Sequence, residues 1–148
     1  MRHHTKDKGD TGLGFVLSSL MSNGISVALP LSEHLPFDCI AIGPQGDLRK
    51  VSVKYRSSAS SGSVKVQLRS TWADRHGSHT KKHEKGSYDV IAIYCPETTL
   101  CYFVRMDEIT GEEITLRVEA LHSRKPEKYF HLATNYTDPL RLFAPVVQ

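Results

Sequence analysis

Residues 35–56 read LPFDCIAIGPQGDLRKVSVKYR, and their pattern is the strongest indication of the fold. Two apolar runs flank a polar turn that contains proline and glycine, a pattern that predicts a β-hairpin. Because side chains alternate along a strand, we expect Lys50, Ser52 and Lys54 on one face of the second run. The first run has a carboxylate, Asp38, at its start. The hairpin is therefore predicted to present an acidic and a basic side chain on neighbouring strands.

The size and composition of the chain are those of one globular domain spanning residues 1–148. Apolar residues make up 39% and charged residues 24%, and the formal net charge is +3. A mildly basic chain can bind nucleic acid where its charge is segregated. Three scattered cysteines predict reduced core thiols rather than a disulfide framework. The chain contains neither an apolar signal core nor a run of about 18 apolar residues. We therefore expect a cytoplasmic, intracellular protein without a membrane partner.

Periodicity predicts the remaining elements. An amphipathic helix is expected over Thr11–Asn23, with Asp10 or Thr11 as its N-cap. The other expected elements are strands over 25–31, 63–69 and 114–118, a second antiparallel hairpin over 88–105, a short helix over 106–109 and helical turns over 127–136. One helix ahead of a mostly antiparallel strand series predicts an α/β or α+β single sheet with flanking helices.

Residues 69–87 are predicted to form a long basic loop, because Trp72 is nearly their only apolar side chain. Loops of this length in a compact domain are usually functional or disordered. Cationic side chains in and near it are candidates for DNA phosphate contacts, and a solvated loop is the alternative. The candidate DNA-binding residues are Arg56, Arg69, Arg75, His76, Lys81, Lys82 and Lys85. A zinc site formed by His76, His79 and His83 is another hypothesis, but their spacing and the lack of a cysteine give it poor support.

Several motifs in chain order resemble the PD-(D/E)xK nuclease superfamily. They are Lys8-Gly9-Asp10, the helix, then GISV at 24–27, PFD at 36–38 and VSVK at 51–54. Stretches at 88–98, 102–104 and 114–118 are similar to small group I intron homing endonucleases of the cyanobacterial type. The resemblance implies a restriction-endonuclease-like central mixed β-sheet flanked by helices. It also implies phosphodiester hydrolysis that depends on Mg²⁺, with Mn²⁺ as a possible substitute.

The resemblance also implies roles for individual residues. Asp38 matches the metal-binding carboxylate and Lys54 the catalytic lysine, while Val53 would offer its backbone carbonyl to the metal. Position 52 departs from the family pattern, because Ser52 stands where an acid, or in some relatives glutamine, is expected.

Three interpretations of Ser52 stay open. Gln67 or Asp10 completes the site from another element, or Ser52 binds the metal through water, or cleavage is slow or absent. Asp10 also has an alternative explanation as a helix N-cap.

The function that these residues and the resemblance imply is site-specific cleavage of double-stranded DNA. A 148-residue chain contacts limited DNA, so we expect a homodimer or a homotetramer. Two alternatives remain. The first is a structure-specific nuclease that resembles Holliday junction resolvases, and the second is a DNA-binding module of the same fold that has lost cleavage.

Overall fold

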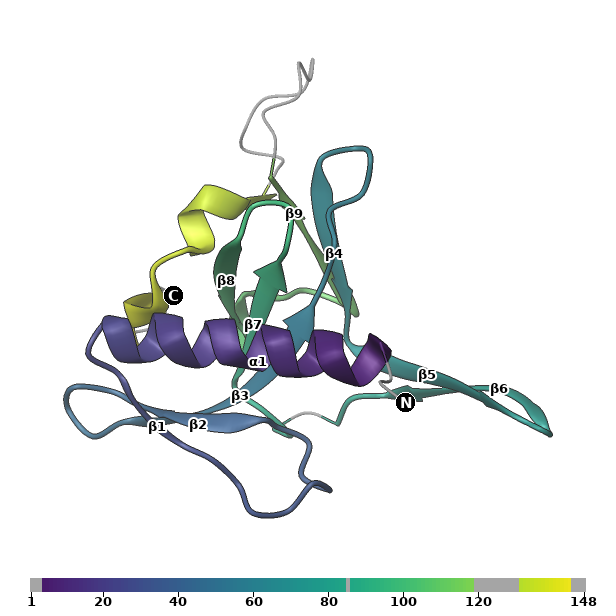
Figure 1. The fold of residues 1–148 in the computed structure, drawn as a ribbon, viewed down its shortest axis with the longest axis horizontal. Helices are drawn as coiled ribbons and strands as arrows, with labels where there is room; N and C mark the ends of the chain where they lie inside the picture. Colours follow the sequence, from purple (N-terminus) through teal and green to yellow (C-terminus); the bar gives the residue numbers. More distant parts are fainter. Residues whose placement is uncertain (1–3, 85, 119–130, 145–148) are drawn as a thin grey trace.

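The computed structural model describes residues 4–84, 86–118 and 131–144. A five-stranded sheet carries helix α1 on one face and a three-stranded sheet on the other, and a two-stranded ribbon extends from this body (Figure 1). The predicted α/β class with a central mixed sheet is confirmed. In the described residues, the face opposite α1 is covered by strands and 3-10 turns rather than by a second α-helix.

Helix α1 spans His4–Ser22 and buries one stripe of side chains, including Val16 and Leu20, against the central sheet. It begins well before the predicted start. The Thr11 hydroxyl donates to the Asp7 carbonyl at 2.8 Å, which places it in the helix interior. The predicted N-cap at Asp10 or Thr11 is therefore wrong, since the polar residues before it extend the exposed helix and a single glycine costs only about 1 kcal/mol.

The central sheet has the strand order β1-β2-β3-β7-β8. Its strands are β1 (Ser26–Ala28), β2 (Cys39–Ile42), β3 (Leu48–Tyr55), β7 (Val90–Cys95) and β8 (Leu100–Arg105). Strands β3 and β7 are parallel, and the other neighbours are antiparallel, which makes the sheet mixed. Both predicted hairpins, β2–β3 and β7–β8, are confirmed. Strand β1 is shorter than the strand predicted over 25–31.

The second sheet has the order β10-β9-β4. It consists of β4 (Ser63–Gln67), β9 (Glu113–Arg117) and β10 (His131–Leu132), with 3-10 turns η1 (Met106–Glu108), η3 (Ala133–Tyr136) and η4 (Pro139–Phe143) nearby in the chain. Buried side chains such as Val66, Ile93 and Leu116 join the two sheets. The strands predicted near 63–69 and 114–118 and the short helix at 106–109 are confirmed. The turns predicted over 127–136 lie partly outside the described residues, and their described part forms β10 and η3.

The basic segment is a β-ribbon and not the loop that we predicted. Strand β5 (Arg69–Asp74) pairs antiparallel with β6 (Gly77–Lys82). The chain reverses at Gly77, whose φ of 121° favours glycine. The sequence pattern concealed the ribbon, because a strand that buries neither face shows no alternation of apolar and polar residues.

The three cysteines are free thiols, as predicted, with Cys39 and Cys95 buried and Cys101 half-buried. Burial and the neighbouring Asp38 carboxylate raise the pKa of Cys39 to about 12, and burial raises the pKa of Cys101 to about 11. Both groups therefore remain protonated near neutral pH.

Candidate active site

Asp38 is fixed at the point where strand β2 begins. Its backbone N–H donates to the Val51 carbonyl at 2.8 Å, and its carboxylate oxygen Oδ2 accepts from the Val53 N–H at 2.7 Å. The pairing of β2 with β3 ends at Cys39 and Val51, so the next part of β3 has no strand neighbour on that side. Asp38 satisfies the Val53 N–H there, and the hydrogen bond sets the direction of its carboxylate.

Alternation along β3 separates the site from the helix. A methyl group built on Gly12 of α1 would lie 3.7 Å from the Val53 side chain, so Val53 faces the helix. Ser52 and Lys54 therefore face the opposite side of the sheet, as the sequence predicted. Ser52 is only 4% exposed, although its side chain is polar.

A cleft of ≈ 430 Å³ brings the predicted central residues together. Three segments line it: the chain before β2, the middle of β3, and the end of β6 with the residues that follow it. The lining residues are Leu35, Pro36, Asp38, Ser52, Val53, Lys54, Lys81, Lys82, His83, Glu84, Ser87 and Tyr88. The acidic and basic side chains predicted to meet across neighbouring strands thus share one cleft.

The surroundings of Lys54 in the cleft lower the pKa of its ammonium group. Burial lowers the pKa of Lys54, the Arg56 guanidinium lowers it further, and the Asp38 carboxylate acts in the opposite direction. Lys81 and Lys82 add positive charge to the same cleft, and Lys82 also forms an ion pair with Glu112. This surplus of cationic groups suits an anionic ligand.

Other candidate residues lie apart from the cleft. Gln67 accepts a hydrogen bond from Arg69 at 3.2 Å, and both line a separate hollow of ≈ 300 Å³ with Arg56 and Lys65. Asp10 lies within α1, which covers the opposite face of the sheet, and it does not line the cleft.

The remaining DNA-contact candidates lie on or after the ribbon. Arg75 and His76 are at its turn, where the Arg75 guanidinium contacts the His76 ring at 3.1 Å. Lys85 lies outside the described residues.

Two side chains that sequence reasoning did not assign to the site also line the cleft. Glu84 is a second carboxylate, besides Asp38, among the described residues that line the cleft. The His83 ring nitrogen Nδ1 lies 2.5 Å from the Tyr88 hydroxyl, and burial and the charge of Lys54 lower the pKa of His83. Neither residue has a local sequence signal, because both reach the cleft only through the return of the ribbon.

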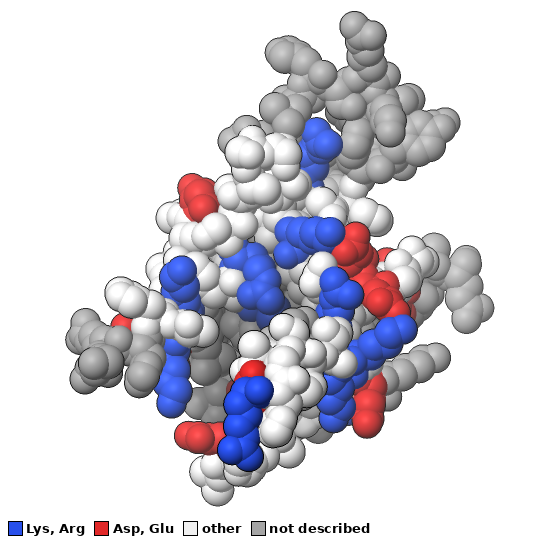
Figure 2. Space-filling view, turned by 90° about the vertical axis from the view of Figure 1, so that its right-hand side faces the viewer, with Lys and Arg blue, Asp and Glu red and all other residues white. Residues whose placement is uncertain are grey.

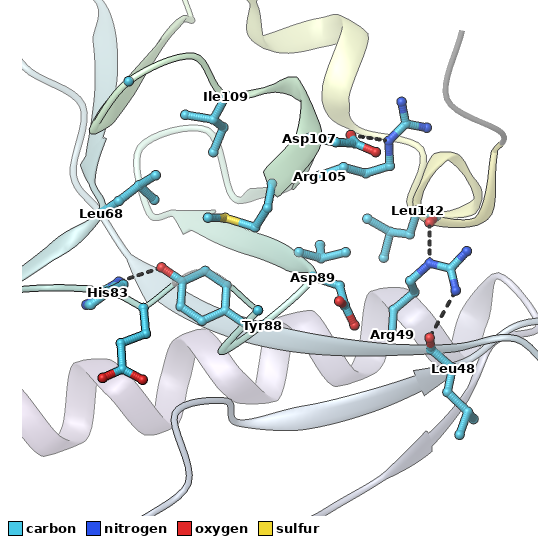
Figure 3. A pocket seen from close by; sticks show the side chains of 15 residues that line it. Leu48, Arg49, Leu68, His83, Tyr88, Asp89, Arg105, Asp107, Ile109 and Leu142 are labelled. Carbon is cyan, nitrogen blue, oxygen red and sulfur yellow. Dashed lines mark hydrogen bonds and ion pairs between the residues drawn. The ribbon is translucent and has the colours of Figure 1, made fainter. Parts of the chain in front are cut away.

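A larger hollow of ≈ 640 Å³ lies beyond His83 and Tyr88 (Figure 3). Its arginines already have partners in the chain. Arg49 donates to the Leu142 carbonyl at 3.2 Å, and Arg105 pairs with Asp107 at 3.0 Å (Figure 3). The hollow therefore offers a weaker case for an anion than the cleft does.

The described residues do not support the zinc hypothesis. They contain no group of three His, Cys, Asp or Glu side chains arranged to hold a metal ion. His79 instead bonds Asp74 at 3.0 Å, and His83 is engaged with Tyr88.

A family model described as PD-(D/E)XK endonuclease matches residues 3–139. The chain belongs to the PD-(D/E)XK endonuclease family. The solved structure of a bacterial homing endonuclease, I-Ssp6803I, is similar to it with a TM-score of 0.76 and 26% identity, over 95% of this chain and 93% of that one. The search of curated proteins yields no match to this chain. The resemblance inferred from the motifs is therefore confirmed, and the chain has the fold and family of a nuclease. Within the described residues, no helix has the length and apolar character needed to span a membrane.

Proposed function

We propose that this PD-(D/E)XK protein is a site-specific, homing-type endonuclease that hydrolyses phosphodiester bonds of duplex DNA with Mg²⁺. The observation that carries the proposal is the meeting of Asp38 and Lys54 in one cleft, with the Asp38 carboxylate held by the Val53 N–H at 2.7 Å. Family membership supports the nuclease chemistry, and the similar structure of a homing endonuclease supports the biological class.

The donors of the cleft fit a hard divalent cation. Mg²⁺ is usually held by one or two carboxylates together with substrate phosphates and water. Asp38 offers an anionic oxygen and Val53 a backbone carbonyl, and a carboxylate that accepts one hydrogen bond keeps capacity for a cation. When bound, Mg²⁺ or Mn²⁺ supplies Lewis-acid activation of a phosphoryl oxygen and lowers the pKa of a water molecule.

The side chains around this position have distinct roles in the proposal. Lys54 stabilises negative charge on the phosphate and orients the attacking water, and its lowered pKa eases the transfer of a proton. Asp38 keeps its orientation through its hydrogen bond to Val53, so its carboxylate needs little reorganisation.

Glu84 takes the place of the acid that Ser52 does not provide. A serine hydroxyl is neutral and brings no charge to a cation, and Ser52 is nearly buried. Asp38 and Glu84 are the carboxylates that line the cleft among the described residues. The earlier candidates are less well placed, since neither Gln67 nor Asp10 lines it.

Duplex DNA is the proposed substrate, because Lys54, Lys81 and Lys82 line the cleft and further basic side chains lie on the adjoining ribbon. Figure 2 shows Lys and Arg side chains spread over the described face that carries the ribbon, with acidic side chains among them. Arg69, Arg75, Lys81 and Lys82 belong to the ribbon or its turn, and they would contact phosphates. A homodimer or homotetramer would extend the footprint of this single chain along a target site.

Plasmid nicking in Mg²⁺ or Mn²⁺, with Lys54→Met as the control, tests the proposal. We expect wild-type protein to cleave and the Lys54 variant to bind DNA without cleaving. Stronger cleavage of a four-way junction than of linear duplex would favour the resolvase-like alternative. Binding without cleavage by the wild type would favour a module that has lost activity, the outcome that Ser52 supports.

A further inference from the structure

In the described part of the chain the β5–β6 ribbon pairs with no other strand, and Lys82 at its end forms an ion pair with Glu112. Its strands pair with each other and form their own two-stranded sheet, separate from the two sheets of the body. An isolated two-stranded hairpin is marginally stable in water. The ribbon also projects away from the body (Figure 1), so the chain maintains an exposed element that would be stabilised by binding something else.

One face of the ribbon carries a stacked aromatic pair. Trp72 and His79 lie directly opposite each other, with ring centroids 5.4 Å apart and planes 26° from parallel. Trp72 is 48% exposed, which is unusual for so large an apolar side chain. His79 is held in place by Asp74 at 3.0 Å. The indole is thus presented to solvent on an ordered support.

The same face leads into the catalytic cleft. Lys81 lies two positions after His79 in β6, so alternation puts both on one face, and Lys81 lines the cleft. Two residues of a strand span about 7 Å, which is about two base pairs along a DNA strand. A phosphate bound by Lys81 at the cleft would therefore bring the aromatic pair near bases about two base pairs away.

The positive charge of the ribbon and its two-stranded form favour duplex DNA as its partner. Arg69, Arg75, Lys81 and Lys82 outnumber Asp74 on the ribbon and its turn, and this favours a polyanion. A two-stranded β-ribbon fits the DNA major groove, which is about 12 Å wide and exposes base edges and thymine methyl groups.

We propose that the β5–β6 ribbon enters the major groove of duplex DNA and that the Trp72–His79 pair contacts base edges about two base pairs from the phosphate bound by Lys81. This inference adds a base-recognition element to the proposed endonuclease function and rests on that function. It assigns base recognition to the aromatic face, whereas the cationic side chains contact phosphates.

Trp72 is the only tryptophan of the chain, so its fluorescence reports on this contact alone. The intact protein is titrated at low salt, in EDTA to prevent cleavage, with labelled mixed-sequence duplex DNA. DNA anisotropy measures binding, and acrylamide quenching of Trp72 measures contact. Heparin, a polyanion without bases, is the matched control. We expect duplex DNA to reduce the quenching constant at least about twofold and heparin to leave it nearly unchanged.

Trp72→Ala gives an independent measure. Loss of an interfacial indole is expected to weaken duplex binding about 5-fold or more, whereas Leu100→Ala, which truncates an apolar side chain of similar exposure (47%) on β8, should have a small effect. Binding without protection of Trp72, or equal protection by heparin, would overturn the base contact and leave the endonuclease proposal intact. Absence of any DNA binding would overturn both. Protection that depends on protein concentration without DNA would assign the ribbon to a second copy of the chain instead.

Discussion

The Asp38→Asn variant separates the chemical role of this side chain from its structural role. The carboxylate accepts a hydrogen bond from the Val53 N–H at 2.7 Å, and an asparagine carbonyl oxygen can accept the same bond. A hydrogen bond to a charged group is worth about 1.5–3 kcal/mol and a neutral one about 0.5–1.5 kcal/mol, so the cost to stability is about 1 kcal/mol. For a chain of this size, that lowers Tm by about 2–4 °C.

Cleavage is expected to respond far more strongly than stability. Asparagine removes the anionic oxygen that would hold Mg²⁺, and it removes the charge that supports the protonated form of Lys54. We expect cleavage to fall by about 10²-fold or more, the scale for loss of one preorganised electrostatic group.

The assay for Asp38→Asn combines plasmid cleavage in Mg²⁺, duplex binding in EDTA, and thermal unfolding. Asp38→Ala is the comparison variant, because it also removes the hydrogen bond to the Val53 N–H. Water can replace this exposed bond, so the further cost should be about 0.5–1.5 kcal/mol. Cleavage within a few-fold of wild type by a folded Asp38→Asn protein would refute the reasoning. An equal loss of DNA binding would assign the side chain a structural role.

Three further predictions concern the cleft, the ribbon and the core. Glu84→Gln should weaken Mn²⁺ binding, measured by calorimetry, about 10-fold or more. Adding Ser52→Glu to this variant should restore Mn²⁺ binding, because it returns an acid to the cleft. If the double variant binds Mn²⁺ no better, Glu84 does not replace the acid that the family pattern expects at position 52. Arg75→Ala combined with Lys81→Ala should reduce the slope of log binding constant against log salt by about two, and an unchanged slope would mean that these side chains do not contact phosphates. Gly43→Ala would place a methyl group 2.8 Å from the Phe143 ring, so it should destabilise the protein by about 1–3 kcal/mol in urea unfolding. An unchanged unfolding midpoint would contradict the packing of Gly43 against this ring.

The local part of the site was predictable from the sequence. Alternation within 48–55 and the short turn before it fix which side of the sheet Ser52 and Lys54 face. Asp38 follows from the same hairpin, because its position relative to Val53 depends on one antiparallel register. These relations connect residues that are close in the sequence.

The other wall of the cleft was not predictable in this way. His83 and Glu84 reach it after a ribbon whose polar strands carry no apolar periodicity. The parallel pairing of β3 with β7, which joins Val51 to Val90, is a long-range contact that neither strand specifies alone. The start of α1 was missed for a related reason, since its first turns are exposed and polar.

A crystal structure of the protein with duplex DNA and Ca²⁺ would show the ligands of the proposed metal site directly. We expect one cation about 2.3–2.6 Å from an Asp38 carboxylate oxygen and from the Val53 carbonyl oxygen. The scissile phosphate should contact that cation and the Lys54 ammonium group. A cation bound away from Asp38, or a DNA phosphate backbone that does not reach the cleft, would contradict the account.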